Sequence, residues 1–269
     1  LFRSSMNMRK SRVLKKVKSG KTAISMHLHF TDPGVVEITT MNGYFDCLWI
    51  DMEHIPVGWA EMRAAINTAK LYDTDTLIRV DKSGYSPLLK PLEIDATGIM
   101  VPHLMSFKEA EEIVRTTKFH PLGRRPLDGG NADGKYCQVP VKEYIEFVNR
   151  ERFVLVQIED PEPMAELKEI CALPGLDAIF FGPGDFSQGI GKPGEANSSE
   201  VSEARREVAA RAREAGKIAG TVGTPKNLRV LVEEGYNFVN IGADFIALND
   251  YYKASKDEID KALTMASTS

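Results

Sequence analysis

Four groups of polar residues in this sequence come directly after short apolar segments. They are DMEH at residues 51–54, Arg79, QIED at residues 157–160 and GPGD at residues 182–185. In a barrel of parallel strands the carboxyl ends of the strands meet at one mouth, where such side chains lie close together. Carboxylates, a histidine and an arginine are the groups that acid–base and metal-assisted catalysis use. The pattern therefore predicts an active site built at the ends of strands.

Glu159 and Asp185 are the candidate metal ligands, because they come from neighbouring strands and can share one divalent cation. Two protein oxygens leave coordination positions for water and substrate, which suits Mg²⁺ or Mn²⁺. The alternative is that each acid caps the helix after its strand. Glu159 follows a fully apolar strand, where an unpaired charge is costly. We therefore interpret both residues as ligands.

His54 and Arg79 are the candidates for proton transfer and charge stabilisation. A histidine can act as a general base near neutral pH, although a loop histidine is often a solvated side chain. Because Asp51 and Glu53 stand beside it, we interpret His54 as catalytic. The fixed donors of Arg79 could hold an oxyanion, and a structural salt bridge is the other interpretation. The residues alone leave both roles of Arg79 open.

His27 and His29 form an H-x-H motif, whose two side chains lie on the same face of a strand. Such a pair is typical of the amidohydrolase type of metal-dependent hydrolase, and Asp244 would match its last ligand. That type also needs histidines after the fifth and sixth strands, where this sequence has none. The hydrolase is therefore a minor alternative, and the simpler interpretation is imidazoles packed inside the barrel. His103 and His120 are expected to have no special role.

The alternation of apolar segments with amphipathic stretches predicts a single (β/α)8 barrel (TIM barrel) of the α/β class. Continuous apolar segments such as FVLVQI are typical of parallel strands buried on both faces. An open doubly wound sheet would carry a glycine-rich phosphate turn after its first strand, and HFTDPGVVE contains none. The expected strands are residues 22–29, 47–51, 76–80, 98–102, 153–158, 177–181, 217–221 and 238–241.

Capping residues locate some of the helices between these strands. Ser106 and Glu109 predict a capping box, Thr224 with Pro225 predicts a second helix start, and a third helix begins near Ser199. Residues 121–140 are rich in Gly, Pro, Asn and Asp, and so long a loop is usually a lid or a contact between subunits. We expect residues 1–20 to form an N-terminal extension or helix, and residues 21–265 to form the barrel.

The composition excludes several classes of protein. Of the 269 residues 43% are hydrophobic, enough for a large core, and the net charge of −4 provides no basic surface for nucleic acid. No apolar segment approaches the roughly 20 residues of a membrane helix. Three cysteines without CxxC spacing favour a reducing compartment, and the basic N-terminus lacks the apolar segment of a secretory signal. We therefore expect a cytoplasmic protein without nucleic-acid or membrane partners.

Eight segments together have a specific order and spacing, although each is modest alone. They are TDP at 31–33, FD at 45–46, IDMEH at 50–54, Arg79, GIMVP at 98–102, VQIE at 156–159, FGPGDFS at 181–187 and GYNFVNIG at 235–242. With them the sequence resembles, from about Ala23 to Leu248, the HpcH/HpaI family of metal-dependent pyruvate aldolases. The resemblance implies a (β/α)8 barrel that forms a homo-oligomer, typically a hexamer, with exchanged C-terminal helices.

The resemblance also implies a reaction. Members cleave or form the C3–C4 bond of a 4-hydroxy-2-keto acid, giving pyruvate or a close 2-keto acid and an aldehyde through a metal-stabilised enolate. The cofactor would be Mg²⁺, Mn²⁺ or Co²⁺, without an organic cofactor. Glu159 and Asp185 would bind the metal, while Gln157, Asp185 and the backbone around Gly184 would hold the keto acid. No lysine for a Schiff base ends strand five or six.

The remaining family roles fall on His54 as the base and on Arg79, which would steady the enolate. Glu93 of a neighbouring subunit would raise the basicity of the histidine, and it is one methylene longer than the expected aspartate. Pro126 replaces the last glycine of the common Pro-x-Gly-x-Arg-Gly segment, which reshapes the loop over the aldehyde end of the substrate. The adjacent pair at residues 124–125, Arg-Arg, would bind an acidic substrate tail or form a solvated or interfacial pair.

Other reactions could use the same site. Decarboxylation of an oxaloacetate-like acid, and acyl-CoA lyase or thioesterase chemistry, would stabilise the same enolate, and the sequence separates them weakly from an aldolase. A non-enzymatic barrel with a vestigial site is a further alternative, because a fold does not determine function. Since the expected ligands, base and arginine are all present, the aldolase is the leading interpretation.

Overall fold

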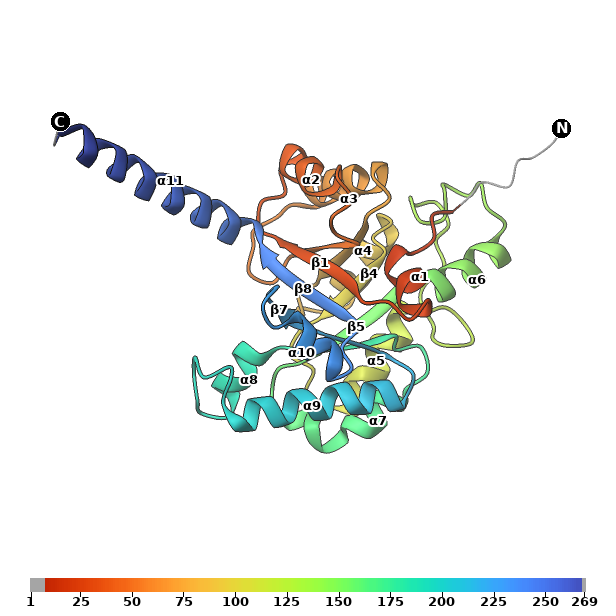
Figure 1. The fold of residues 1–269 in the computed structure, drawn as a ribbon. Helices are drawn as coiled ribbons and strands as arrows, with labels where there is room; N and C mark the ends of the chain where they lie inside the picture. The colour runs from red at the N-terminus through yellow and green to blue at the C-terminus, as the bar shows by residue number, and fades with distance from the viewer. Residues whose placement is uncertain (1–7, 268–269) are drawn as a thin grey trace.

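The computed structural model describes residues 8–267, in which eight parallel strands form a closed barrel and each strand pairs with its neighbours in sequence (Figure 1). β8 closes the barrel on β1, with Phe238 opposite Ala23. The strands are β1 (Ala23–Leu28), β2 (Cys47–Asp51), β3 (Asp75–Arg79), β4 (Gly98–Val101), β5 (Phe153–Ile158), β6 (Ala178–Phe181), β7 (Ile218–Gly223) and β8 (Phe238–Ala243). The predicted (β/α)8 barrel is confirmed, and the first seven residues of the expected extension lie outside the described residues.

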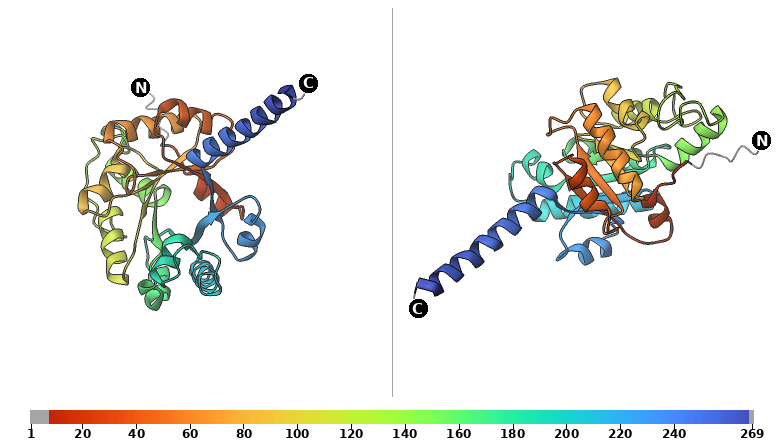
Figure 2. Two further views of the ribbon diagram at one scale, coloured as in Figure 1. Left: turned by 90° about the vertical axis from the view of Figure 1, so that its left-hand side faces the viewer. Right: turned by 90° about the horizontal axis from the view of Figure 1, so that it is seen from above.

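Helices surround the barrel, as the two views in Figure 2 show. They are α1 (Arg12–Lys18), α2 (Pro33–Thr40), α3 (Trp59–Leu71), α4 (Tyr85–Glu93), α5 (Phe107–Thr117), α6 (Val141–Glu151), the 3₁₀ turn η1 (Glu162–Glu166), α7 (Leu167–Ala172), α8 (Pro183–Gly189), α9 (Ser199–Glu214), α10 (Leu228–Glu233) and α11 (Asp244–Ser267). Within residues 8–267, every helix is too short or too polar to cross a membrane.

The strands consist of apolar residues because both of their faces are covered. In the five strands β2 to β6, every residue is buried. One set of side chains, which includes Trp49, Phe153 and Phe180, packs together inside the barrel. The opposite set, which includes Ile99 and Val154, packs against the surrounding helices. This double burial is the source of the continuous apolar segments in the sequence.

All eight expected strands are present, and their bounds differ from the expected ones by two residues or fewer. Ser106 caps α5 by accepting a hydrogen bond from the Glu109 N–H at 3.2 Å, while the Glu109 carboxylate accepts from the Met105 N–H. The helix start predicted at Thr224 is wrong. Thr224 donates its N–H to Asn227 Oδ1 at 2.7 Å, and this contact makes a turn that delays α10 to Leu228.

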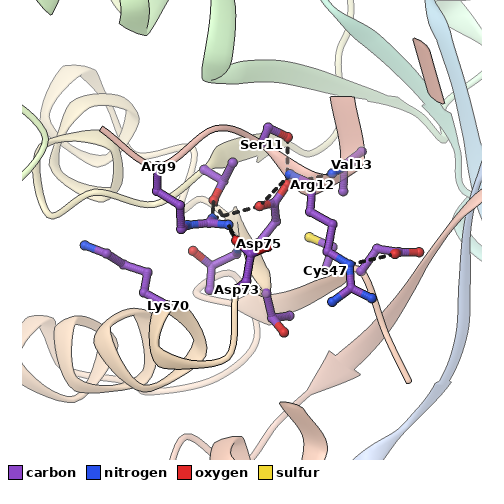
Figure 3. Close-up of polar contacts among 12 residues, drawn as sticks. Arg9, Ser11, Arg12, Val13, Cys47, Lys70, Asp73 and Asp75 are labelled. Atoms are coloured by element: carbon purple, nitrogen blue, oxygen red, sulfur yellow. Dashed lines mark hydrogen bonds and ion pairs between the residues drawn. The ribbon is translucent and has the colours of Figure 1, made fainter. Parts of the chain in front are cut away.

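A single carboxylate fastens the chain before β1 to the amino end of the barrel (Figure 3). Asp75, the first residue of β3, accepts hydrogen bonds from Arg9 Nη2 and Ser11 Oγ, both at 2.7 Å. It also accepts from the backbone N–H groups of Arg12 at 3.1 Å and Val13 at 2.9 Å. The Asp75 side chain is fully buried, so these donors replace its hydration. They hold α1 across the closed end of the barrel.

The last helix leaves the barrel. α11 projects away from the strands as a single extended helix in all the views (Figures 1 and 2). Several large apolar side chains along it are exposed: Ile246, Leu248, Tyr251, Tyr252, Ile259 and Leu263. A row of exposed apolar side chains of this extent is typical of a surface that packs against another chain.

Replacement of Asp75 tests whether this carboxylate holds the closed end of the barrel together. We expect Asp75→Asn to lower the free energy of unfolding by about 3 to 5 kcal/mol, because it leaves buried donors without their charged partner. Chemical denaturation followed by circular dichroism measures the change. Asp73→Asn is the matched control, since the Asp73 side chain is 76% exposed and its ion pair with Arg9 contributes about 1 kcal/mol or less. Equal effects of the two substitutions would contradict the assignment.

Candidate active site at the mouth of the barrel

Arg79, at the carboxyl end of β3, is held by two acids from the end of β2. Its Nε donates to Asp51 Oδ1 at 2.9 Å, its Nη2 donates to Asp51 Oδ2, and Glu53 Oε2 lies 3.2 Å from Nε. Burial opposes the ionisation of Asp51, but the hydrogen bonds and charge of Arg79 outweigh it and lower the pKa of Asp51. Arg79 therefore forms a structural salt bridge, and these contacts leave Nη1 for another anion.

Glu159 follows β5 and is almost completely buried. Its Oε1 accepts the His103 N–H at 2.9 Å, and its Oε2 accepts from Gln157 Nε2 at 2.8 Å. Burial raises the pKa of Glu159 to about 7; the hydrogen bond and charge of His103 oppose this rise, while the charge of Asp185 adds to it. Glu159 is thus a carboxylate whose ionised form is expensive in the protein alone.

A glycine makes room for this carboxylate. A Cβ at Gly182 would lie 2.6 Å from Glu159 Oε2, closer than side-chain packing allows. Gly182 also precedes α8, whose first turn carries Asp185. Within residues 8–267 no side-chain hydrogen bond caps α8, so the structure does not support the interpretation of Asp185 as a cap. Asp185 is exposed at the mouth, within electrostatic reach of Glu159.

The residues around Glu159 fit a divalent cation. A cation between Glu159 and Asp185 would offset both the burial of Glu159 and the repulsion between the two carboxylates. Gln157 Oε1 is buried, and among the described residues it has no hydrogen-bond partner, so it adds an uncommitted oxygen. Carboxylate and amide oxygens are the donors that Mg²⁺ and Mn²⁺ prefer.

His54 lies in the loop after β2, and 61% of its side chain is exposed. Its Nε2 is 3.6 Å from Glu53 Oε2, the atom that also faces Arg79. His54 therefore joins the cluster through Glu53, on the solvent side of the mouth. Within residues 8–267, His54 forms an ion-pair contact with Glu53 and none with Glu159.

His103, which the sequence did not single out, contacts the acids of the mouth. The residue lies two positions after β4 with a positive φ of 48°, and its N–H donates to the Glu159 carboxylate. Its Nδ1 lies 2.8 Å from Asp160 Oδ2, and its Nε2 lies 3.6 Å from Glu53 Oε1. Burial lowers the pKa of His103, but the hydrogen bond with Asp160 and the surrounding carboxylates outweigh it and raise the pKa. The acids of the mouth thus favour the protonated form of His103.

Glu93 is not part of this cluster within one chain. It is the last residue of α4, a helix that runs back from the mouth towards the amino end of β4. Burial raises the pKa of Glu93, and the charge of Arg125 opposes the rise. Its predicted role would require a neighbouring subunit and stays a prediction.

Two of the three expectations for Arg125 are wrong, because this residue is neither solvated nor available to a substrate tail; an interfacial role stays a prediction. Its guanidinium is buried, and Nη2 donates to Asp133 Oδ2 at 2.6 Å. The Tyr144 hydroxyl donates to the same oxygen at 2.6 Å. This buried pair holds the long loop at residues 121–140 against α6. Arg124, by contrast, is exposed.

Asp244 is not available as the acidic ligand that the hydrolase alternative requires. Asp244, at the start of α11, accepts hydrogen bonds from the backbone N–H groups of His29 at 3.0 Å, Phe30 at 2.8 Å and Phe245 at 2.8 Å. The Asp244 carboxylate is therefore committed to the backbone at the junction of β1 and α11. The structure does not give it the position of a metal ligand that the alternative requires.

The fold and the mouth together define a (β/α)8-barrel enzyme with a carboxylate-rich site. Residues 24–250 match the family model described as HpcH/HpaI aldolase/citrate lyase, and the chain belongs to this family. It is 30% identical over 240 residues to a hydroxypyruvate/pyruvate aldolase of Pseudomonas aeruginosa, with 89% of each chain covered. It is also 30% identical over 226 residues to a 2-keto-3-deoxy-L-rhamnonate aldolase of Klebsiella pneumoniae subsp. pneumoniae, with 84% of each covered.

A solved structure agrees with these sequence comparisons. The HpcH/HpaI aldolase from Desulfitobacterium hafniense DCB-2 superposes with a TM-score of 0.86 at 27% identity, covering 91% of this chain and 95% of that one. The family predicted from the sequence is confirmed, and with it the prediction of a lyase of the aldolase type. The family generally depends on a divalent metal.

The raised pKa of Glu159 predicts a pH-dependent stability of the metal-free protein. The pKa is about 7 in the folded protein against an ordinary 4.5, so the unfolded chain loses this proton first and stability falls as pH rises between these values. The full loss is of the order of 3 kcal/mol. Denaturation between about pH 5 and about pH 8 should show this slope in the wild type and a flatter one in Glu159→Gln. Because His103 is present in both proteins, the difference between the two slopes reports on Glu159. Identical slopes would contradict the raised pKa of Glu159.

Gly182 predicts a steric test of the metal site. We expect Gly182→Ala to displace the Glu159 carboxylate and weaken Mn²⁺ binding about tenfold or more, measured by isothermal titration calorimetry. Gly184→Ala is the matched control, because nothing lies within 4 Å of a Cβ at that position. It should leave Mn²⁺ affinity unchanged. Equal affinities of both variants and the wild type would argue against Glu159 as a ligand.

Proposed function

We propose that this protein is a divalent-metal-dependent aldolase that cleaves or forms the C3–C4 bond of a 4-hydroxy-2-keto acid. The products of cleavage are pyruvate, or a close 2-keto acid, and an aldehyde. The observation that carries the proposal is the buried Glu159 carboxylate, which faces Asp185 and the uncommitted Gln157 oxygen beside Arg79. This is the arrangement that a cation bound to a chelating keto acid requires.

The residues of the mouth would divide the reaction among them. A cation held by Glu159 and Asp185 would polarise the 2-keto carbonyl of the substrate when bound. Gln157 and the backbone at Gly184 would fix the carboxylate and keto group. Arg79 Nη1 would donate to the oxygen on which negative charge develops.

Proton transfer would be the task of His54. Its imidazole would take the proton of the C4 hydroxyl, after which the C3–C4 bond breaks. The C4 oxygen then forms the carbonyl of the departing aldehyde, and the bonding electrons remain with the pyruvate fragment as its enolate. Return of a proton to C3 completes pyruvate. The exposed position of His54 permits this exchange with solvent.

The assembly that we propose is a homo-oligomer, a hexamer by resemblance, in which α11 packs on a neighbouring barrel. The exposed apolar side chains of α11 support this exchange. An oligomer would also give Glu93 a route to the His54 of another subunit. A cytoplasmic location agrees with the three free cysteines, two of which are buried.

Deuterium exchange at C3 of pyruvate tests the proposed enolate chemistry without knowledge of the aldehyde. Proton NMR in D₂O follows the loss of the C3 proton signal of pyruvate. With protein stripped by EDTA, this exchange should not exceed the metal-only background, and added Mg²⁺ or Mn²⁺ should restore it. Glu159→Gln should abolish it, because the cation loses a ligand. Glu162→Gln, at an exposed acid three residues further, should exchange like the wild type. Absence of metal-dependent exchange in the wild type would contradict the proposal.

A further inference from the structure

Three residues at the mouth of the barrel form a group that the proposed aldolase mechanism does not use as ligands. His27 and His29 belong to β1 and the residue after it, and Asp51 ends β2. One ligand atom from each residue lies within 4.8 Å of the others, and His27 Nε2 is 3.8 Å from Asp51 Oδ2. The two ring centroids are 4.5 Å apart. Ligand atoms of a tetrahedral ion with bonds of roughly 2.1 Å lie roughly 3.4 Å apart. The His27–Asp51 distance of 3.8 Å is close to this spacing, and rotation of the His29 ring would bring its nitrogen nearer.

The imidazole nitrogens of this group are uncommitted. His27 Nε2 and His29 Nδ1 are both buried, and neither has a hydrogen-bond partner within residues 8–267. Buried polar atoms are normally satisfied, so two orphaned nitrogens in one place require an explanation. Packing alone, as expected from the sequence, leaves both of them unpaired.

Neighbouring aromatic side chains fix the two rings. His27 stacks on Trp49 with centroids 4.3 Å apart and an interplanar angle of 13°. His29 meets the edge of Phe245 at 4.5 Å and 73°. Rings fixed in this way lose little further freedom when they bind an ion, which is the property of a preorganised ligand set.

The protonation states also suit an ion. Burial, together with the neighbouring His29, lowers the pKa of His27 to about 3, so its imidazole is neutral at physiological pH and offers a lone pair. Arg79 lowers the pKa of Asp51, which is therefore ionised. A carboxylate has about four lone-pair positions, so Asp51 Oδ2 can accept from Arg79 Nη2 and still bind an ion.

We propose that His27, His29 and Asp51 form a second divalent-metal site, selective for Zn²⁺ and chemically distinct from the oxygen site of Glu159 and Asp185. Imidazole donors suit Zn²⁺, whereas Mg²⁺ prefers oxygen ligands. Three protein ligands leave a fourth position for water or for an oxygen of a substrate. The site lies beside Arg79, so a bound ion adds positive charge where the proposed reaction develops negative charge.

The test measures metal binding and not activity, so it does not depend on the aldolase proposal. In the metal-stripped double variant Glu159→Gln, Asp185→Asn, we expect one Zn²⁺ per chain by calorimetry. Co²⁺ as a spectroscopic substitute should give the intense visible absorption of a tetrahedral site. Adding His29→Asn to this background should weaken Zn²⁺ binding by more than the roughly tenfold loss typical of changes outside the ligand sphere. The Co²⁺ band should disappear.

Two controls keep the outcome decisive. His120→Gln in the same background replaces an exposed histidine and should retain the full Zn²⁺ affinity and the Co²⁺ band. His27→Gln gives an independent removal of a ligand, and unfolding midpoints show that each variant is folded. If the Glu159→Gln, Asp185→Asn variant binds no Zn²⁺, or if replacement of His27 or of His29 leaves binding unchanged, the second site does not exist. Zn²⁺ binding lost equally in His120→Gln would likewise overturn it.

Discussion

The negative charge of a carboxylate buried at the end of a barrel strand needs hydrogen-bond donors or a positive charge in place of water. The two ends of this barrel meet that need in different ways, and much of the architecture follows from the difference. At the closed end Asp75 is surrounded by donors from Arg9, Ser11 and two backbone N–H groups. At the mouth Arg79 compensates Asp51 by a bidentate contact. Both arrangements are complete within one chain, and both hold structure.

Glu159 is compensated incompletely, which distinguishes the functional end of the barrel. Its two hydrogen bonds, from the His103 backbone and from Gln157, do not prevent burial from raising its pKa to about 7. Asp185 increases the cost further. The protein therefore keeps a carboxylate in a position that stabilises the fold poorly, and in the proposed function a bound cation would offset this cost. Such a deficit of charge compensation is typical of a functional site.

The sequence predicted the barrel well because its signal is local. Strands covered on both faces must be apolar along their length, so segments such as FVLVQI mark them without knowledge of the fold. Reading the residues at the ends of those segments singled out Glu159, Arg79 and Asp185 as candidates, and the structure places them within electrostatic reach of one another because barrel topology brings strand ends together. The helix start at Thr224 failed for an equally local reason, because a side-chain contact with Asn227 formed a turn first.

His103 and Arg125 could not be interpreted from sequence because no spacing pattern indicates their partners. His103 lies two residues after β4, so a reading of every strand end would have marked it, but its contacts are with Glu159 and Asp160, more than 50 residues further along the chain. Arg125 looked like a surface residue in a polar loop. Its burial depends on Asp133 and on Tyr144 of α6, a packing that no spacing pattern indicates.

Arg79 connects the two halves of the mouth, and this connection limits what either half can bind. Its guanidinium touches Asp51 and Glu53, stacks over the Trp49 ring at 5.0 Å, and its charge acts on Glu159. Trp49 in turn stacks against His27. A cation near His27 would draw on the negative charge of Asp51 that now balances Arg79, and would leave more of the Arg79 charge for an anion at Nη1. The charge of Arg79 acts both on His27 and on Glu159. The two proposed metal sites are therefore electrostatically coupled through one arginine, although no residue is a ligand in both.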